Sequence, residues 1–333
     1  RVRGRAAAAL AAFAFLAASG WLPSDAAAAG GEPLALAVRR IDAFGIARAE
    51  TRFGALEFLG GIDITARDRR LGGLSGIDVG ADGDAVTMVS DDGYLVRGRL
   101  VHENGRLVGL ADAEIRGLFP VERDKFEADA EDLAFAPDGT GGLLAMERRR
   151  TPLLAFRVED GWPVPTEPVA VPPAVLKLKM NRGLESVAYA PAASPLAGRA
   201  IIVAERAAER GAATIPAWIL GGGAFRIVRR DDYDIASARF LPDGDLLVLE
   251  RRFTPISGIA MRIRRIDGGR IRDGAELDGA VLIEAGMTDQ IDNMEGLAVH
   301  REASGRVVLT LVSDDNKSIL QRTLLLQFAI AAD

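Results

Sequence analysis

Short apolar runs alternate with turn residues along the chain from about residue 30 to its end. Asp-Gly turns separate several of these runs, as at Ala81–Gly83, Pro137–Gly139 and Pro242–Gly244. Asp-Gly between alternating apolar residues is a strong hairpin signal. Helical periodicity is weak throughout this part of the chain, so the pattern predicts an all-β protein.

The pattern repeats five times. In each copy, an apolar strand with one polar or small residue inside it precedes a turn and a second apolar strand that ends in charged residues. Aligning the copies on that internal residue gives spacings of 56, 54, 51 and 59 residues. A period near this length, with several strands per copy, predicts a single β-propeller of four-stranded blades. The aligned residues are Ser75, Glu131, Glu185, Ala236 and Glu295.

Two strand-like runs, Leu34–Ile41 and Leu56–Thr65, precede the first copy, and the last copy ends after Leu324–Ile330 without a fourth strand of its own. An N-terminal strand that completes the last blade would close the ring and remove both free sheet edges. We therefore expect one closed domain over residues 30–333, with five visible repeats and five or six blades in total.

The N-terminal segment has the pattern of a secretory signal peptide. Three Arg within the first five residues precede an apolar run from Ala6 to Leu22, and small residues continue to Ala29. A membrane anchor is the rival interpretation, but the run is slightly short for one. We expect a signal peptide over residues 1–29 and a periplasmic or secreted protein that keeps no stable membrane anchor after cleavage. With no Cys in the chain, the exported fold is expected to need no disulfide.

Composition excludes several classes of function. The chain has 41 Lys and Arg against 47 Asp and Glu, a net charge of -6, which provides no basic face for nucleic acid. Two His and no Cys exclude a zinc site built on those residues, and we expect His102 and His300 to lie at the surface. The segment Gly73–Gly76 lacks the spacing of a nucleophile elbow. We expect a monomer.

Acidic residues should converge at one funnel, because corresponding positions of the blades form rings around the propeller axis. Such carboxylates repel one another when buried unless a divalent cation or neighbouring Arg balances them. An all-oxygen donor set without thiols favours Ca²⁺, although Glu-Arg pairs that only fasten blade to blade remain the alternative. The candidate metal ligands are Glu131, Glu185, Glu295, Glu147, Glu205 and Glu250.

The charged pairs that end the second strands suggest chemistry on a phosphate ester. Arg forks and a metal ion both recognise phosphate oxygens, and a carboxylate can orient or deprotonate a water molecule. The candidate substrate-binding residues are Arg148, Arg206, Arg251 and Asn316. The candidate catalytic residues are Asp91, Asp92, Asp314 and Asp315, because the first and last blades become neighbours when the ring closes.

Seven short segments together carry a family resemblance: Phe58–Ile62, Gly72–Ile77, Val89–Gly93, Glu131–Leu133, Asn181–Glu185, Leu249–Arg251 and Asn293–Leu297. In these segments the chain resembles the bacterial phytase-like proteins described by an esterase-like activity of phytase, which are distantly like the calcium-dependent propeller phytases. This resemblance implies an exported β-propeller with phosphoesterase or esterase activity. The calcium phytases concentrate Lys and Asp at the funnel, whereas this chain has Arg and Glu, so phytate is not carried over as the substrate.

Two hypotheses follow from the sequence. The first is a metal-dependent hydrolase, a phosphoesterase in particular, that acts on a small anionic ester at the propeller funnel. The second is a non-catalytic propeller that is stabilised by Ca²⁺ and recognises a ligand or a protein. A fold hosts many functions, so the geometry of the site has to decide between them.

Overall fold

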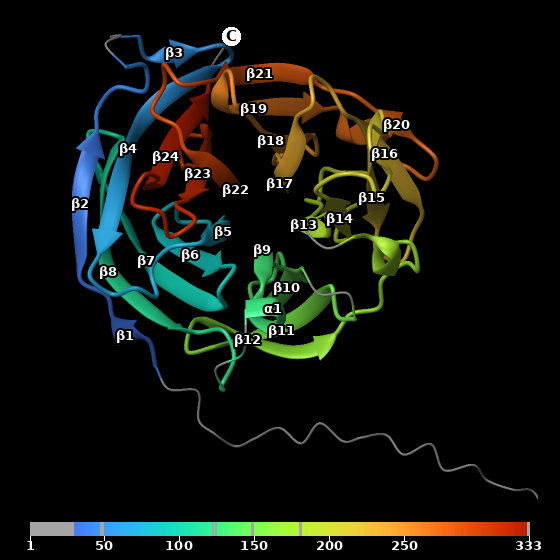
Figure 1. The fold of residues 1–333 in the computed structure, drawn as a ribbon, viewed down its shortest axis with the longest axis horizontal. Helices are drawn as coiled ribbons and strands as arrows, with labels where there is room; N and C mark the ends of the chain where they lie inside the picture. The colour runs from blue at the N-terminus through green and yellow to red at the C-terminus, as the bar shows by residue number, and fades with distance from the viewer. Residues whose placement is uncertain are drawn as a thin grey trace, which may run out of the picture.

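The computed structural model describes residues 30–46, 50–121, 123, 125–147, 150–179 and 182–331. The predicted signal peptide and the candidate residue Arg148 lie outside these ranges, so both stay predictions. Over the described residues the chain folds into antiparallel sheets arranged radially around one axis (Figure 1). The all-β prediction is confirmed, because the helical elements there are only α1 (Lys125–Ala128) and the 3-10 turns η1 (Val175–Lys177) and η2 (Gly268–Arg270).

The described residues form five blades, and in the first four the innermost strand comes first in the chain. The first blade contains β5 (Leu74–Val79), β6 (Ala85–Ser90), β7 (Tyr94–Glu103) and β8 (Arg106–Gly117). The second contains β9 (Ala130–Phe135), β10 (Gly141–Met146), β11 (Leu153–Glu159) and β12 (Trp162–Pro168). The third contains β13 (Leu184–Tyr189), β14 (Ala200–Ala204), β15 (Thr214–Ile219), β16 (Ala224–Val228) and the short β20 (Glu276–Leu277).

The last two blades complete the ring. The fourth contains β17 (Asp234–Phe240), β18 (Leu246–Thr254), β19 (Gly258–Ile266) and β21 (Ala280–Ala285). The fifth contains β22 (Asn293–Arg301), β23 (Val307–Asp314), β24 (Thr323–Ile330) and β4 (Leu56–Ala66). The inner strands contact one another in the cyclic order β5, β9, β13, β17, β22 and back to β5, so the count within the described chain is five and not six.

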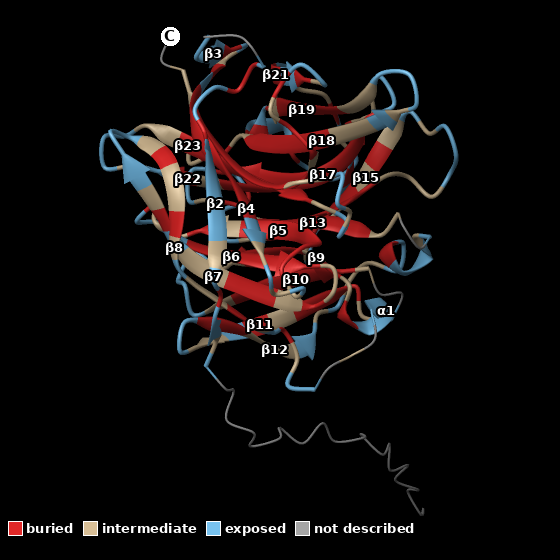
Figure 2. Ribbon diagram, turned by 60° about the vertical axis from the view of Figure 1, so that its left-hand side comes forward, coloured by how far each residue is buried: buried red, intermediate tan, exposed pale blue. Residues whose placement is uncertain are grey.

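An N-terminal strand closes the ring, as the sequence predicted. β4 pairs antiparallel with β24, from Ile330 opposite Leu56 to Thr323 opposite Ile64. The earlier strands β2 (Leu36–Ile41) and β3 (Arg52–Phe53) pair with β4, and β1 (Glu32–Pro33) pairs with β8. Because each sheet is covered by its neighbours, the core lies between the blades, where Figure 2 shows continuous burial.

Each inner strand carries a β-bulge at the residue that the repeat alignment singled out. The pairing between first and second strands shifts by one residue at Ser75, Glu131, Glu185, Ala236 and Glu295. A bulge inserts one extra residue on one strand and re-aims its side chain. The column read from the sequence is therefore a structural feature that all five blades repeat.

A buried ion pair fills the channel below the bulges. The Arg239 guanidinium lies 2.7 Å from both carboxylate oxygens of Asp132 and also donates to carbonyl oxygens in four blades. Small residues next to the bulges, such as Gly76 and Gly296, let the inner strands approach this closely, because a Cβ at either glycine would meet a neighbouring inner strand. The carbonyl acceptors belong to Ile77, Leu133, Val187 and Ala238.

Candidate functional site

One end of the propeller axis collects the charged residues; we call it the mouth. The second strand of each blade ends there, opposite the beginning of the first strand. Backbone pairing puts the same position of each blade at this end, with Asp91 N donating to Gly73 O and Glu147 N to Asp129 O. The five equivalent residues form the mouth ring: Asp91, Glu147, Glu205, Arg251 and Asp314.

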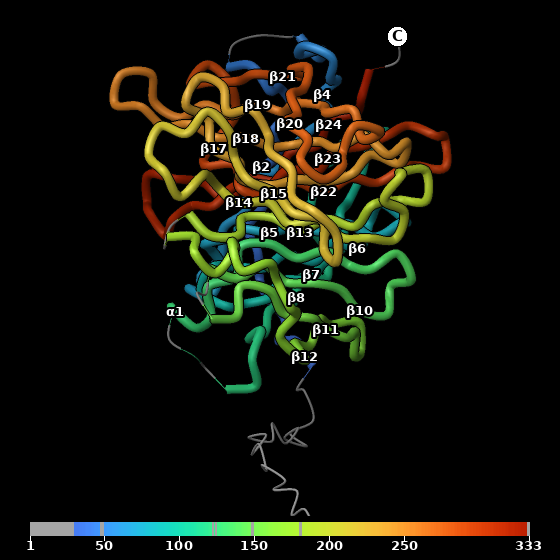
Figure 3. Tube along the Cα trace, turned by 90° about the vertical axis from the view of Figure 1, so that its right-hand side faces the viewer, coloured from blue at the N-terminus to red at the C-terminus, as the bar shows by residue number. Residues whose placement is uncertain are grey.

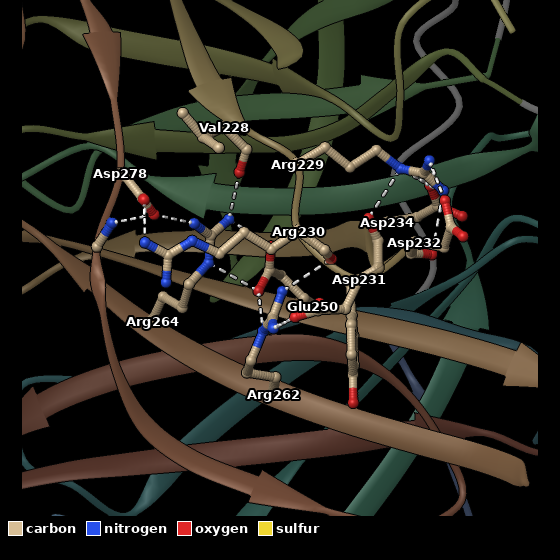
Figure 4. Close-up of polar contacts among 12 residues, drawn as sticks. Val228, Arg229, Arg230, Asp231, Asp232, Asp234, Glu250, Arg262, Arg264 and Asp278 are labelled. Atoms are coloured by element: carbon tan, nitrogen blue, oxygen red, sulfur yellow. Dashed lines mark hydrogen bonds and ion pairs between the residues drawn. The ribbon is translucent and has the colours of Figure 1, made fainter. Parts of the chain in front are cut away.

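The prediction for Glu250 is wrong by one residue. Between β17 and β18, Glu250 pairs with Ile235 and Arg251 with Asp234, so Arg251 and not Glu250 occupies the mouth ring. Because successive strand residues point to opposite faces, the Glu250 side chain leaves the mouth. It is fully buried between Arg262 and Arg264, with contacts of 2.5 to 2.9 Å to their guanidinium groups (Figure 4).

Arg251 brings three of the predicted acids together. Its guanidinium lies 2.9 Å from Glu295, 3.3 Å from Glu185 and 3.5 Å from Glu205. Burial raises the pKa of Glu295 to about 7 even though Arg251 opposes that shift. Burial, followed by repulsion from Glu131, raises the pKa of Glu185 well above its usual range. This half of the mouth therefore holds one shared cation among several carboxyl groups.

The opposite half of the mouth is more acidic. Burial, followed by repulsion from Asp129, raises the pKa of Glu131 well above its usual range, and burial beside Asp91 raises the pKa of Asp129 to about 6. Burial also raises the pKa of Asp314 to about 7, although its carboxylate accepts a hydrogen bond from the backbone N of Asn316. Burial raises the pKa of Asp91, against the effect of a lysine.

Two lysines reach into this acidic half, and neither was predicted as a site residue. Lys125, on α1, places Nζ 2.7 Å from Asp91, and Lys317 contacts Asp92. The Oδ1 atom of Asp91 is nevertheless buried without a hydrogen-bond partner. Among the described residues, no three Asp, Glu or His side chains are already arranged around one point as metal ligands. The two lysines are thus the counter-ions that the structure shows for Asp91 and Asp92.

The remaining predicted residues lie at or near the mouth. Arg206 pairs with Glu205 at 2.8 Å and with Asp234 at 2.6 Å. Asp315 accepts hydrogen bonds from Gly73 N and Thr323 Oγ1. Its carboxylate therefore links the loop after β23 to Gly73 and to the start of β24. Asn316 is exposed, with a left-handed backbone φ of 45°.

The two histidines lie far from the acids, at the opposite ends of their strands. His102 is exposed and hydrogen-bonds Gln327, as predicted. His300 is only 7% exposed and packs against Gly83, so the surface prediction is wrong for it. β22 extends to Arg301, so His300 still lies within the strand, where its imidazole is buried.

A cavity of about 420 Å³ opens beside Arg251, between the third, fourth and fifth blades. Four arginines line it, and the carboxyl groups of Glu205, Asp232 and Asp234 balance them in part. Sequence reasoning missed two of the four, because the misaligned register hid Arg252 and because Arg229 lies in a connection between blades. The cavity arginines are Arg206, Arg229, Arg251 and Arg252.

Asn293 connects the cavity to the acidic half. Its side chain donates a hydrogen bond to Glu295 at 2.6 Å and accepts one from Arg251 at 3.2 Å. Its backbone pairs with that of Asp314. Three features therefore follow one another along one side of the mouth: the arginine-lined cavity, Glu295 with its contact to Arg251, and Asp314 with its pKa of about 7.

The fold and this mouth define a five-bladed β-propeller whose polar residues gather at one end of the axis. The chain belongs to the phytase-like family, described as esterase-like activity of phytase, and the family model matches residues 69–317. No curated protein matches the chain. Among solved structures, the β-propeller domain of Cps50 (Swd1) from Myceliophteria thermophila is similar, with 10% identity and a TM-score of 0.40, covering 88% of this chain and 98% of that one.

Proposed function

We propose that the chain is a hydrolase of phosphate esters that binds its substrate in the arginine-lined cavity at the mouth. The observation that carries the proposal is one cavity lined by four arginines, next to buried carboxyl groups of the mouth. Planar guanidinium groups recognise phosphate oxygens through paired hydrogen bonds. The family description, esterase-like activity of phytase, supports an ester as the substrate.

The residues divide the chemistry between them. Arg206 and Arg252 hold the phosphate, and Arg251 orients it while it remains paired with Glu295. Asp314, whose pKa burial raises to about 7, exchanges a proton near neutral pH, where general acid-base groups are most effective. In hydrolysis a water molecule attacks phosphorus and the bond from phosphorus to the leaving oxygen breaks. Asp314 passes its proton to the leaving oxygen, and the proton that the attacking water loses returns to Asp314.

Metal dependence belongs to the same proposal. The possible metal ligands of the acidic half are all oxygen atoms, as Ca²⁺ prefers. The buried Oδ1 atom of Asp91 has no hydrogen-bond partner, so it is available as such a ligand. Asp91, Asp129 and Glu131 would hold the cation, and since they do not already surround one point, binding would draw them together. When bound, a divalent cation would supply charge stabilisation for the phosphoryl oxygens. Glu185 and Glu295 are not included among these ligands, because Arg251 already balances their negative charge.

A second candidate function is supported by the ion pairs that close the channel along the propeller axis. Arg251 bridges three Glu at the mouth and Arg239 fills the channel below. Such Glu-Arg and Asp-Arg pairs are what a non-catalytic binding propeller would use to fasten its blades. In that case the arginine cavity recognises an anionic ligand without converting it.

Hydrolysis assays separate these functions. We would measure turnover of p-nitrophenyl phosphate, bis-p-nitrophenyl phosphate, phytate and p-nitrophenyl acetate, with Ca²⁺ and after chelation. We expect phosphate-ester turnover that is lost in Asp314→Asn, a raised KM in Arg252→Gln, and no change in Arg226→Gln, an exposed arginine on β16.

The outcomes are distinct. Turnover that survives chelation but not Asp314→Asn refutes the metal and keeps the hydrolase. Acetate cleavage that ignores both changes refutes the mechanism. No turnover, combined with phosphate binding that Arg252→Gln weakens, identifies the binding propeller.

A further inference from the structure

Exposed apolar side chains gather around the mouth. Among the described residues, eleven large hydrophobic side chains are exposed; seven of these lie in the connections on the mouth side of the blades, and an eighth, Phe253, lies near the mouth-side end of β18. Three are almost completely exposed: Ile256 and Ile319 at about 100% and Leu320 at 87%. We call the exposed residues of these connections the rim. Its apolar members are Val121, Phe126, Leu176, Phe253, Ile256, Met287, Ile319 and Leu320.

Several contacts between neighbouring mouth-side connections show that these loops together form one face of the molecule. Lys125, next to Phe126, reaches Asp91 in the turn between β6 and β7, and Lys317, next to the turn of Ile319, contacts Asp92 in the same turn. The turn between β18 and β19 packs on Met287, whose Sδ would lie 2.8 Å from a Cβ at Gly258. Figure 3, a quarter turn from Figure 1, places α1 at the left-hand edge of the molecule.

The exposed charge of the rim is opposite in sign to that of the whole chain. Nine exposed Lys or Arg in the described mouth-side connections stand against four exposed acids, although the net charge of the chain is -6. The acids of the mouth ring and of the bulges are buried or half-buried below this level. The exposed cations are Arg67, Arg69, Lys125, Arg150, Lys177, Lys179, Arg210, Arg230 and Lys317, and the exposed acids are Glu127, Glu209, Asp231 and Asp232.

We propose that the rim docks on an anionic lipid surface and turns the mouth toward it. Isolated apolar side chains on protruding loops, surrounded by Lys and Arg, are what an interfacial contact requires: the apolar groups enter the headgroup region and the cations are attracted to anionic lipids. Single exposed apolar residues are ordinary, but eight on one face around one cavity form a surface with a common role. Among the described residues no helix is long and apolar enough to span a membrane, so this contact is peripheral.

Charge and shape favour lipid over a protein partner. The apolar residues are distributed around the mouth on separate loops, and a flat fluid surface can receive all of them at once. Docking goes beyond the proposed hydrolysis and does not depend on it, since the arginine cavity would face lipid headgroups whether or not it converts them.

Single-cysteine labelling tests the proposal directly, because the chain has no Cys of its own. We would place an environment-sensitive NBD fluorophore at Ile256→Cys or Ile319→Cys, and at Val281→Cys as the control, which is exposed on β21 away from the rim. Vesicles of phosphatidylcholine alone are compared with equal parts of phosphatidylcholine and phosphatidylglycerol. We expect a blue shift and a several-fold rise in emission at Ile256 and Ile319 on the anionic vesicles, and none at Val281.

Sedimentation with the same vesicles provides a second measurement. In Ile256→Ser/Ile319→Ser/Leu320→Ser, partition onto anionic vesicles should fall by about tenfold or more, because the apolar area that enters the interface is lost. Val281→Ser should not change it, and the melting temperature should be unchanged in both because all four sites are exposed. The full chain is used throughout, so any contribution of residues 1–29 is common to every variant.

Three results would overturn the proposal: silent probes at both rim positions, an equal response at Val281, or an unchanged partition in the triple variant. If the rim probes respond to added soluble protein and not to vesicles, the rim is a protein interface instead. Phosphate-ester turnover is measured separately without vesicles, so failure of docking and failure of hydrolysis are distinguishable.

Discussion

The buried pair of Arg239 and Asp132 should be the most sensitive point of the ring. Arg239 is 7% exposed and Asp132 1% exposed. The guanidinium makes two bonds of 2.7 Å to the carboxylate and bonds of 2.7 to 3.1 Å to carbonyl oxygens of four blades. Replacement by Met in Arg239→Met keeps much of the volume but removes every one of these donors.

The expected loss follows from the unpaired charge. Removing one partner of a buried ion pair typically costs about 3–5 kcal/mol, because the remaining charge stays buried without compensation. Asp132 keeps only its bonds from Ser186 Oγ and the backbone N atoms of Leu133 and Val187. We therefore expect the free energy of unfolding of Arg239→Met to fall by about 4 kcal/mol.

Urea unfolding at neutral pH measures this loss. With an m value of about 3 kcal/mol/M, the midpoint should fall by roughly 1–1.7 M. Adding Asp132→Asn to Arg239→Met removes the uncompensated charge while an amide oxygen still accepts hydrogen bonds, so the double variant should recover roughly 2 kcal/mol. Arg226→Met, at an exposed position, should change stability by less than about 0.5 kcal/mol.

Two results would refute the reasoning. A loss below about 1 kcal/mol in Arg239→Met, the size of an ordinary substitution, would show that the guanidinium does not fasten the blades. A double variant no more stable than Arg239→Met would show that lost carbonyl contacts, and not the carboxylate charge, determine the cost.

Further predictions concern three other sites. Glu250→Gln should cost about 3 kcal/mol because two buried guanidinium groups lose the carboxylate that they share and keep only Asp231 and Asp278, yet leave turnover at the mouth unchanged; lost turnover at full stability would return Glu250 to the site. Gly73→Ala should lower turnover more than stability, since Gly73 has a φ of 64° and a Cβ there would collide with Asp91; equal turnover at pH 7 would contradict this. Burial lowers the pKa of His300 from its usual value, so the native state favours the neutral imidazole: this contribution to stability is fully present above the unfolded pKa and is lost as the pH falls through the lower folded pKa. Unfolding curves of His300→Leu should accordingly lose less stability than wild type between about pH 7 and pH 5; an equal loss in both proteins would contradict this.

Much of the architecture could be predicted from sequence because two patterns recur: apolar runs alternate with turns, and this whole arrangement is repeated five times. The five internal polar or small residues marked the first strands, and these positions proved to be the five bulges. The apolar run at Leu56–Thr65 predicted ring closure, since the last repeat lacked its outer strand.

The details of the site could not be predicted as well, and the fourth blade shows why. Glu250-Arg251 looks identical to the Glu205-Arg206 pair, yet the pairing of β17 with β18 puts Arg251, and not Glu250, opposite Asp234. The turn between the first and second strands is not of the same length in every blade, so the sequence does not mark which residue reaches the mouth, and a shift of one residue reverses which face a side chain occupies. Arg239 carried only a weak signal, a lone Arg in the inner strand β17.

Closure by β4 also fixes an order of events during synthesis. β4 ends at Ala66 and its partner β24 begins at Thr323, 257 residues later. At translation rates of about 5–20 residues per second, this separation corresponds to roughly 13–50 s. Over that interval β2 can cover one edge of β4, while the other edge waits for a strand that has not yet been made. Chains truncated before Thr323 would keep that edge permanently open, and an open apolar edge pairs readily with a second copy. The same join that seals the mature ring therefore makes incomplete chains the ones most prone to aggregate.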